Sequence, residues 1–164
     1  MDATIAPPVF TVPLLVDLTM IAHRMCADER AQFAAFSGIG HYDPEATALA
    51  LMNTRGPKYL MTDASGAPLV AGGFDPVRPG VYNAWLACTD RGWSEHGRAL
   101  TRFCRRQCDA LLAGGAHRIE VTALASRTRA HEWYERAMLM RREGVHPGYG
   151  AGRENAITFA RVAV

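Results

Sequence analysis

The chain has 164 residues, of which 49% are hydrophobic and 21% are charged, and this is the size and composition of one folded domain. The composition excludes a disordered or collagen-like chain. No apolar run approaches the ~20 residues that cross a bilayer, which excludes an integral membrane protein. The opening MDATIAPPVF lacks the basic and long apolar regions of a secretory signal. We therefore expect a cytoplasmic protein with no membrane span.

The charge is unevenly distributed along the chain. Residues 1–90 hold five cations and nine acids, whereas residues 91–164 hold thirteen cations and seven acids, for a total of +2. A basic second half can attract the phosphates of a nucleotide cofactor or of DNA. The alternative is a solvated surface, because an arginine-rich and alanine-rich composition also follows from a GC-rich genome.

Four cysteines, at positions 26, 88, 104 and 108, form no C-x-x-C pair. The spacing of Cys104 and Cys108 places both on one helical face, but His96 is eight residues away and no further ligand pair follows. We therefore expect no metal site and four reduced thiols in the core. An acyl-accepting role for Cys88 is the less favoured alternative, since no histidine is paired with it locally.

The first part of the chain predicts an arm and three elements. Residues 1–13 carry three prolines and no periodicity, so they predict an extended arm, followed by a single domain over 14–164. The arm could dock on another protein or pack back on its own domain. The apolar stretch 14–25 predicts a first strand, and 27–36 has helix-forming composition. A further helix should begin at Asp43, which is followed by proline and glutamate.

The remainder predicts a meander followed by alternating helices and strands. Residues 58–74 predict two strands around a Ser-Gly turn, and 81–89 a third. A long amphipathic helix should then run to Gly114. A strand over 117–124, a helix over 127–138 and two closing strands, 139–145 and 154–164, complete the chain.

This order predicts an α/β (α+β) fold with a mixed central sheet of six to seven strands flanked by about four helices. The crossover from 81–89 to 117–124 should be a right-handed parallel βαβ unit. The order resembles the fold of the Gcn5-related N-acetyltransferases (GNAT). In that family a glycine-rich loop, R-G-x-G-x-G-x-x-L, holds the pyrophosphate of acetyl-CoA.

The corresponding stretch here is GWSEHGRAL (92–100), in which Gly97 and Leu100 match. Trp93 and Glu95 replace two of the glycines, and a carboxylate beside a diphosphate repels it. We therefore expect acetyl-CoA to bind weakly or not at all.

The resemblance also implies which residues would form a site. If acetyl-CoA binds, Ala87 and Cys88 at the strand end and His96, Gly97 and Arg98 after it would hold the cofactor.

If the protein is active, Tyr134 in AHEWYERAML (130–139) would protonate the leaving thiolate, as the family's late tyrosine does. The alternative is that Tyr134 only packs its helix on the sheet. The strand 81–89 supplies no carboxylate as a base.

A narrower resemblance links IAHRMCADERAQFAAFSG and the late EGVHPGYGAGRENAITFAR to small GNAT-like internal virion proteins of short-tailed bacteriophages. It implies a virion-associated or assembly protein that binds other virion proteins, located in the virion and the host cytoplasm. An active N-acyltransferase with an atypical loop is the alternative. A third hypothesis is DNA binding through the basic second half.

Overall fold

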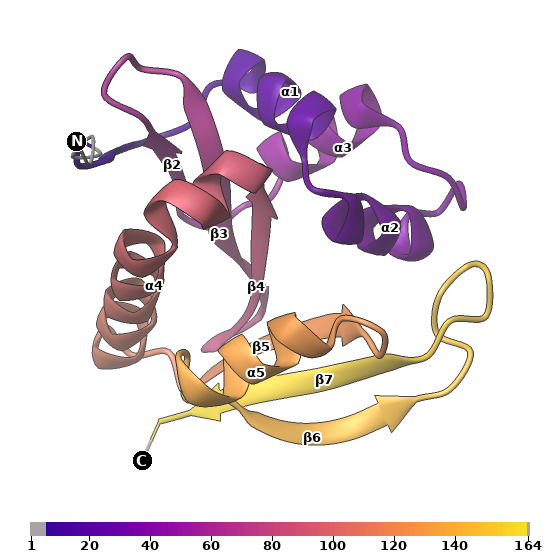
Figure 1. Ribbon diagram of the computed structural model, residues 1–164. Coiled ribbons are helices and arrows are strands. Elements are labelled where there is room, and N and C mark those ends of the chain that lie inside the picture. Colours follow the sequence, from indigo (N-terminus) through magenta and orange to yellow (C-terminus); the bar gives the residue numbers. More distant parts are fainter. Residues whose placement is uncertain (1–5, 164) are drawn as a thin grey trace.

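The computed structural model describes residues 6–163, which form one seven-stranded sheet with helices packed against it (Figure 1). The strands are β1 (Val9–Thr11), β2 (Lys58–Thr62), β3 (Pro68–Arg78), β4 (Val81–Cys88), β5 (Arg118–Leu124), β6 (Arg141–His146) and β7 (Ala156–Val162). The helices are α1 (Leu15–Arg24), α2 (Ala27–Phe36), α3 (Pro44–Met52), α4 (Asp90–Ala113) and α5 (Thr128–Arg136).

The strand order β1-β2-β3-β4-β5-β7-β6 confirms the predicted mixed sheet. β4 and β5 are adjacent and parallel, as the α4 crossover predicts, whereas every other neighbouring pair is antiparallel. The parallel pairing covers only Val81–Asn83 against Arg118–Glu120. Beyond it the two halves of the sheet fan apart (Figure 1).

The two faces of the sheet carry different helices. On one face, α1 and α3 pack over β2, β3 and β4, with Ala71 and Ala87 buried beneath them. On the other face, α4 and α5 cover β4, β5 and β7 around Phe159 and Ile119. No helix in residues 6–163 has the length and hydropathy that crossing a bilayer requires.

The prediction of a strand over 14–25 is wrong, since this stretch forms α1. Its buried residues, Leu18, Ile21, Ala22 and Met25, recur at helical spacing and pack against α3 and the sheet. The helical period is hidden in the sequence because the opposite side of α1 also carries apolar residues, which are exposed. The structure consequently has five helices in its described part, one more than expected.

The start of α3 is as predicted. The Asp43 carboxylate accepts a hydrogen bond from the backbone N–H of Ala46 at 2.8 Å, and Pro44 is the first helical residue.

Part of the proline-bearing arm belongs to the sheet. Residues 9–11 form β1, which pairs antiparallel with β2 at the sheet edge. The Phe10 ring stacks on Phe103 of α4, with centroids 3.9 Å apart and planes inclined by 9°. Residues 1–5 of the predicted arm lie outside the described residues. For residues 9–11 the structure therefore favours packing on the chain's own domain.

The contact between Phe10 and Phe103 predicts that the arm contributes to stability. Phe10→Ala should lower the free energy of unfolding by about 1–3 kcal/mol, because it removes half-buried aromatic area and a stacked pair. The control is Val12→Ala, whose side chain is 74% exposed and should change stability by less than about 0.5 kcal/mol. Equal effects of the two variants in urea denaturation would contradict this role of β1.

Candidate functional site

A cleft of about 1730 Å³ occupies the region where β4 and β5 separate. Its walls come from α2 and α3 on one side and from the start of α4 and the length of α5 on the other. Ala84 and Leu86 of β4 and Thr122 of β5 lie along it, past the last paired residues of these strands. Because the strands are not paired here, their backbone groups need other partners.

Helix α2 crosses the end of the gap and supplies partners for β4. The backbone N–H of Cys26 donates to the Cys88 carbonyl at 3.0 Å, and Met25 forms an isolated bridge with Thr89. One turn later, the Glu29 carboxylate accepts a hydrogen bond from the Cys88 N–H at 2.6 Å. Both backbone groups of Cys88 are therefore satisfied by the segment that begins α2.

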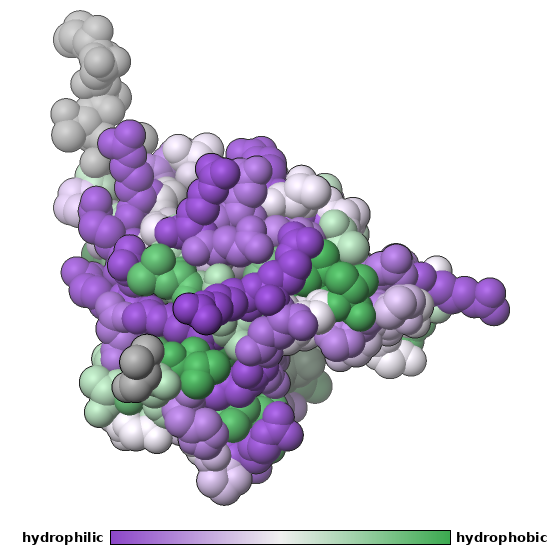
Figure 2. All heavy atoms as spheres, turned by 90° about the horizontal axis from the view of Figure 1, so that it is seen from below, coloured by the Kyte–Doolittle hydropathy of each residue, from purple (hydrophilic) through white to green (hydrophobic). Residues whose placement is uncertain are grey.

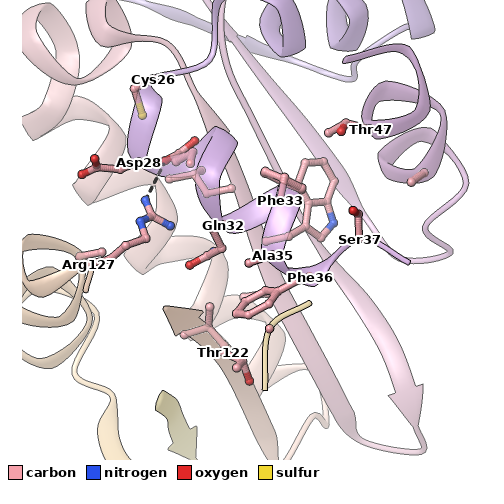
Figure 3. Close-up of a pocket in the computed structure, with 18 of the residues that line it drawn as sticks. Cys26, Asp28, Gln32, Phe33, Ala35, Phe36, Ser37, Thr47, Thr122 and Arg127 are labelled. Carbon is pink, nitrogen blue, oxygen red and sulfur yellow. Dashed lines mark hydrogen bonds and ion pairs between the residues drawn. The ribbon is translucent and has the colours of Figure 1, made fainter. Parts of the chain in front are cut away.

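The end of β5 is completed in the same way. The Leu124 N–H donates to the Gln32 side-chain oxygen at 3.1 Å, and the Leu124 carbonyl lies 2.9 Å from a ring nitrogen of His131 in α5. Figure 3 shows Gln32 of α2 projecting into the space between the two halves of the sheet. Groups of α2 and α5 thus take the place of a neighbouring strand on both sides of the gap at its carboxyl end.

Glu29 is the most unusual group in the cleft, since its side chain is only 2% exposed. Its partner is Arg127, just before α5, with a guanidinium nitrogen 3.4 Å from the carboxylate (Figure 3, dashed line). Burial raises the pKa of Glu29 to about 7, although Arg127 and the Cys88 N–H both favour the charged form.

The sequence reasoning missed Glu29, Gln32 and Arg127 as cleft residues. Their partners lie 59, 92 and 98 residues away, so no local pattern marks them.

Of the six residues proposed from the resemblance, the structure brings Tyr134 to the cleft. Its ring packs against Phe159 and Trp133, with centroids 5.3 and 5.6 Å away. Burial raises the pKa of Tyr134 to about 12. The phenol is therefore protonated at neutral pH, which is compatible with either a proton donor or a packing residue.

The other five residues are not among those that line the cleft. The Ala87 side chain is buried beneath α1 and α3, and Cys88 reaches the gap only through its backbone. His96, Gly97 and Arg98 lie in the second and third turns of α4, with His96 buried and Arg98 exposed.

The stretch expected to form a phosphate-binding loop is helical. β4 ends at Cys88, Thr89 is the N-cap, and α4 begins at Asp90. The Thr89 hydroxyl accepts from the Gly92 N–H at 3.2 Å. A Cβ on Gly92 would lie 2.5 Å from a methyl of Val70, so this glycine permits close packing of α4 on β3 and forms no loop.

These residues do not fit the diphosphate of acetyl-CoA. The Cys88 N–H is already bonded to Glu29, and the first turn of α4 presents the acidic Asp90 to the cleft. The nearby Arg91 is bonded to Glu95 at 2.9 Å and to Asp63 at 3.2 Å. The groups that could bind an anion are therefore paired within the chain, and a second anion would meet the Asp90 carboxylate.

The four cysteines are free thiols. Burial raises the pKa of Cys26, at the cleft, to about 11, and it also raises the pKa of Cys88. Neither is an activated nucleophile at neutral pH. In the described part of the chain, no three histidine, cysteine or acidic side chains gather as a metal site would require.

Comparison with solved structures shows that the chain has the GNAT fold. It superposes on an N-acetyltransferase from Staphylococcus aureus Mu50 with a TM-score of 0.74 and 13% identity, covering 97% of this chain and 100% of that one. An acetyltransferase of the GNAT family from Bacillus anthracis gives 0.71 and 12%, covering 99% of each chain.

A variant of spermidine N-acetyltransferase from Vibrio cholerae gives a TM-score of 0.69 and 11% identity, covering 94% of this chain and 95% of that one. No protein-family model matches the sequence, and neither does any curated protein.

The raised pKa of Glu29 predicts a pH-dependent stability. A carboxyl that is protonated in the folded state up to about pH 7 and in the unfolded state only below about pH 4.5 stabilises the fold at low pH. The free energy of unfolding should therefore fall as the pH rises from about 4.5 to about 7.

Glu29→Gln should reduce the change of the unfolding free energy with pH by about 1–3 kcal/mol. The amide keeps an acceptor for the Cys88 N–H but does not titrate. The measurement is urea denaturation at a series of pH values. Glu132→Gln is the matched control and should leave the slope unchanged, because Glu132 of α5 is exposed and forms no ion pair with residues 6–163. The interpretation is wrong if Glu29→Gln and the wild type show the same slope.

Proposed function

We propose that this chain is a non-catalytic binding module with the GNAT fold, acting as a virion-associated or assembly protein of a bacteriophage. The observation that carries the proposal is the position of Glu29. Its carboxylate accepts a hydrogen bond from the Cys88 N–H at the end of β4 and pairs with Arg127 inside the cleft. A cofactor with a diphosphate would have to displace this buried pair. The direct joining of β4 to α4 through Thr89 supports the same conclusion.

Exposed apolar residues support a role in binding other proteins. Five large apolar side chains in and beside β1 and the start of α1 are 45–74% exposed: Val9, Val12, Leu14, Leu15 and Val16. Clustered exposed apolar side chains mark sites of protein association. β1 also lies at the edge of the sheet, where a strand from a partner could pair with it.

The phage assignment rests on the resemblance of two segments, 21–38 around α2 and 143–161 from β6 into β7, to small internal virion proteins. In the structure, these segments meet, because the Ala151 N–H donates to the Ala35 carbonyl at 2.8 Å and Phe36 contacts Tyr149 edge-on at 5.4 Å. The two stretches that carry the resemblance therefore form one wall of the cleft.

The second candidate function is an acetyl-CoA-dependent N-acyltransferase. It is favoured by the separation of β4 and β5 and by the presence of Tyr134, Arg129 and Glu120 on the cleft. This function would require the Glu29–Arg127 pair to open.

Calorimetric titration of the whole chain with acetyl-CoA distinguishes the two functions. We expect no binding tighter than about 100 μM. A dissociation constant of about 10 μM or lower, or release of free thiol from acetyl-CoA with an amine acceptor, would overturn the non-catalytic proposal.

A pair of variants tests the reason for the weak binding. At about pH 8, above the pKa of Glu29, Glu29→Ala should gain affinity for acetyl-CoA by about tenfold, because it removes a charge and frees the Cys88 N–H. The comparison is the double variant Trp93→Gly and Glu95→Gly, which restores glycines but places them inside α4, at a cost of about 1 kcal/mol each. Because these two positions are helical, the double variant should not gain affinity for acetyl-CoA. If the double variant gained affinity and Glu29→Ala did not, the first turns of α4, and not Glu29, would be what prevents binding.

The virion role has a separate test. Mass spectrometry of purified particles of the encoding phage should detect the chain at a constant copy number per particle. Its absence from particles that are otherwise complete would contradict a virion-associated role.

A further inference from the structure

The solvent side of α4 carries a row of arginines that the cleft does not use. Arg98, Arg102, Arg105 and Arg106 are all exposed. At about 100° and 1.5 Å per residue, they fall within an arc of about 100° and along about 12 Å of the helix. They therefore form one continuous cationic stripe, which we call the α4 arginine stripe.

The carboxylates of α4 lie outside the α4 arginine stripe. Asp90 and Glu95 precede it, and Asp109 follows it. Glu95 is bonded to Arg91, and Asp109 to Arg161 at 2.5 Å. Within residues 6–163, no carboxylate oxygen lies within 4.0 Å of a guanidinium nitrogen of the stripe. The positive charge of the stripe is thus not neutralised by the described part of the chain.

The chemistry of the stripe selects the kind of partner. Interfaces with proteins have an apolar centre, and binding of single-stranded nucleic acid uses exposed aromatic rings for base stacking. In the described chain, α4 exposes no large hydrophobic side chain, since Phe103 and Trp93 pack inward against other rings. A row of guanidinium groups without an apolar or aromatic neighbour matches the phosphates along a nucleic-acid duplex.

We propose that the α4 arginine stripe binds the sugar-phosphate backbone of double-stranded DNA without sequence preference. Duplex DNA carries one charge per ~1.7 Å of axis, so ~12 Å of helix meets a dense row of phosphates. Arg129 and Arg136 of α5 are exposed and form no ion pair with residues 6–163, and they add charge beyond the stripe. The lower face of the molecule is also largely hydrophilic, with smaller apolar patches between (Figure 2).

The test is fluorescence anisotropy with the full chain and a labelled DNA duplex at several salt concentrations. If all four arginines contact phosphates, the logarithm of the binding constant should fall with the logarithm of salt concentration with a slope of about −3.6. Replacing Arg98, Arg102, Arg105 and Arg106 by glutamine should reduce affinity by more than about tenfold at low salt and make the slope less steep by about 3.6.

The matched control is a chain in which Arg24, Arg30, Arg78 and Arg141 are replaced by glutamine. These arginines are exposed, form no ion pair with the described residues and lie on other elements. Both variants lose the same charge, so the control should keep its salt slope and most of its affinity. Circular dichroism and thermal melting establish that both are folded.

Three results would overturn the proposal. One is equal loss of binding in the two variants, which would mean that only the net charge matters. Another is competition by polyglutamate as strong as that by the duplex, which would indicate an acidic protein partner. The third is stronger competition by single-stranded DNA or duplex RNA, which would assign the stripe to a different nucleic acid.

Discussion

The hydrogen bond from the Cys88 N–H to the Glu29 carboxylate joins the elements that surround the gap in the sheet. Because Arg127 faces the same carboxylate, this one side chain holds α2, β4 and the start of α5 together. Loss of either partner would leave a buried charge or a buried N–H unpaired, which costs several kcal/mol in a low-dielectric site. The gap that parallel strands leave when they diverge is therefore closed at its carboxyl end by the chain itself.

This closure changes what the fold can do chemically. By the resemblance to the GNAT family, the diphosphate of acetyl-CoA would lie at the start of the helix after the central strand. In this chain that position is bordered by Glu29 and Asp90, and the adjacent Arg91 is bonded to two carboxylates. The wide part of the cleft remains, with Phe33 and Phe36 of α2 along it (Figure 3). The shape of the cleft is kept while the groups that could bind an anion are paired internally, and this pairing is the structural basis of the non-catalytic function proposed above.

Much of the fold could be predicted because its signals are local. The capping residue at Asp43, the turns around the meander and the apolar face of α4 each act within a few residues. The prediction of a strand over 14–25 was wrong because α1 is apolar on its exposed side as well, so the composition of the stretch masked its helical period. The residues of the cleft could not be predicted for a different reason. Glu29 and Arg127 are 98 residues apart, and their pairing exists only after the sheet has formed.

Helix α4 has a packed inner side and a charged outer side. Its inner side is fixed by packing: Leu100 and Cys108 are buried, the Thr101 hydroxyl accepts a hydrogen bond from the Trp133 indole at 2.9 Å, and Gly92 lets the first turn lie against β3. Its outer side is free of packing constraints and carries the arginines. Cationic groups that would suit an anion at the helix start are thus placed from the third turn onward, facing solvent. An anion that uses them must approach α4 from outside, and a nucleic-acid duplex can do so without entering the cleft.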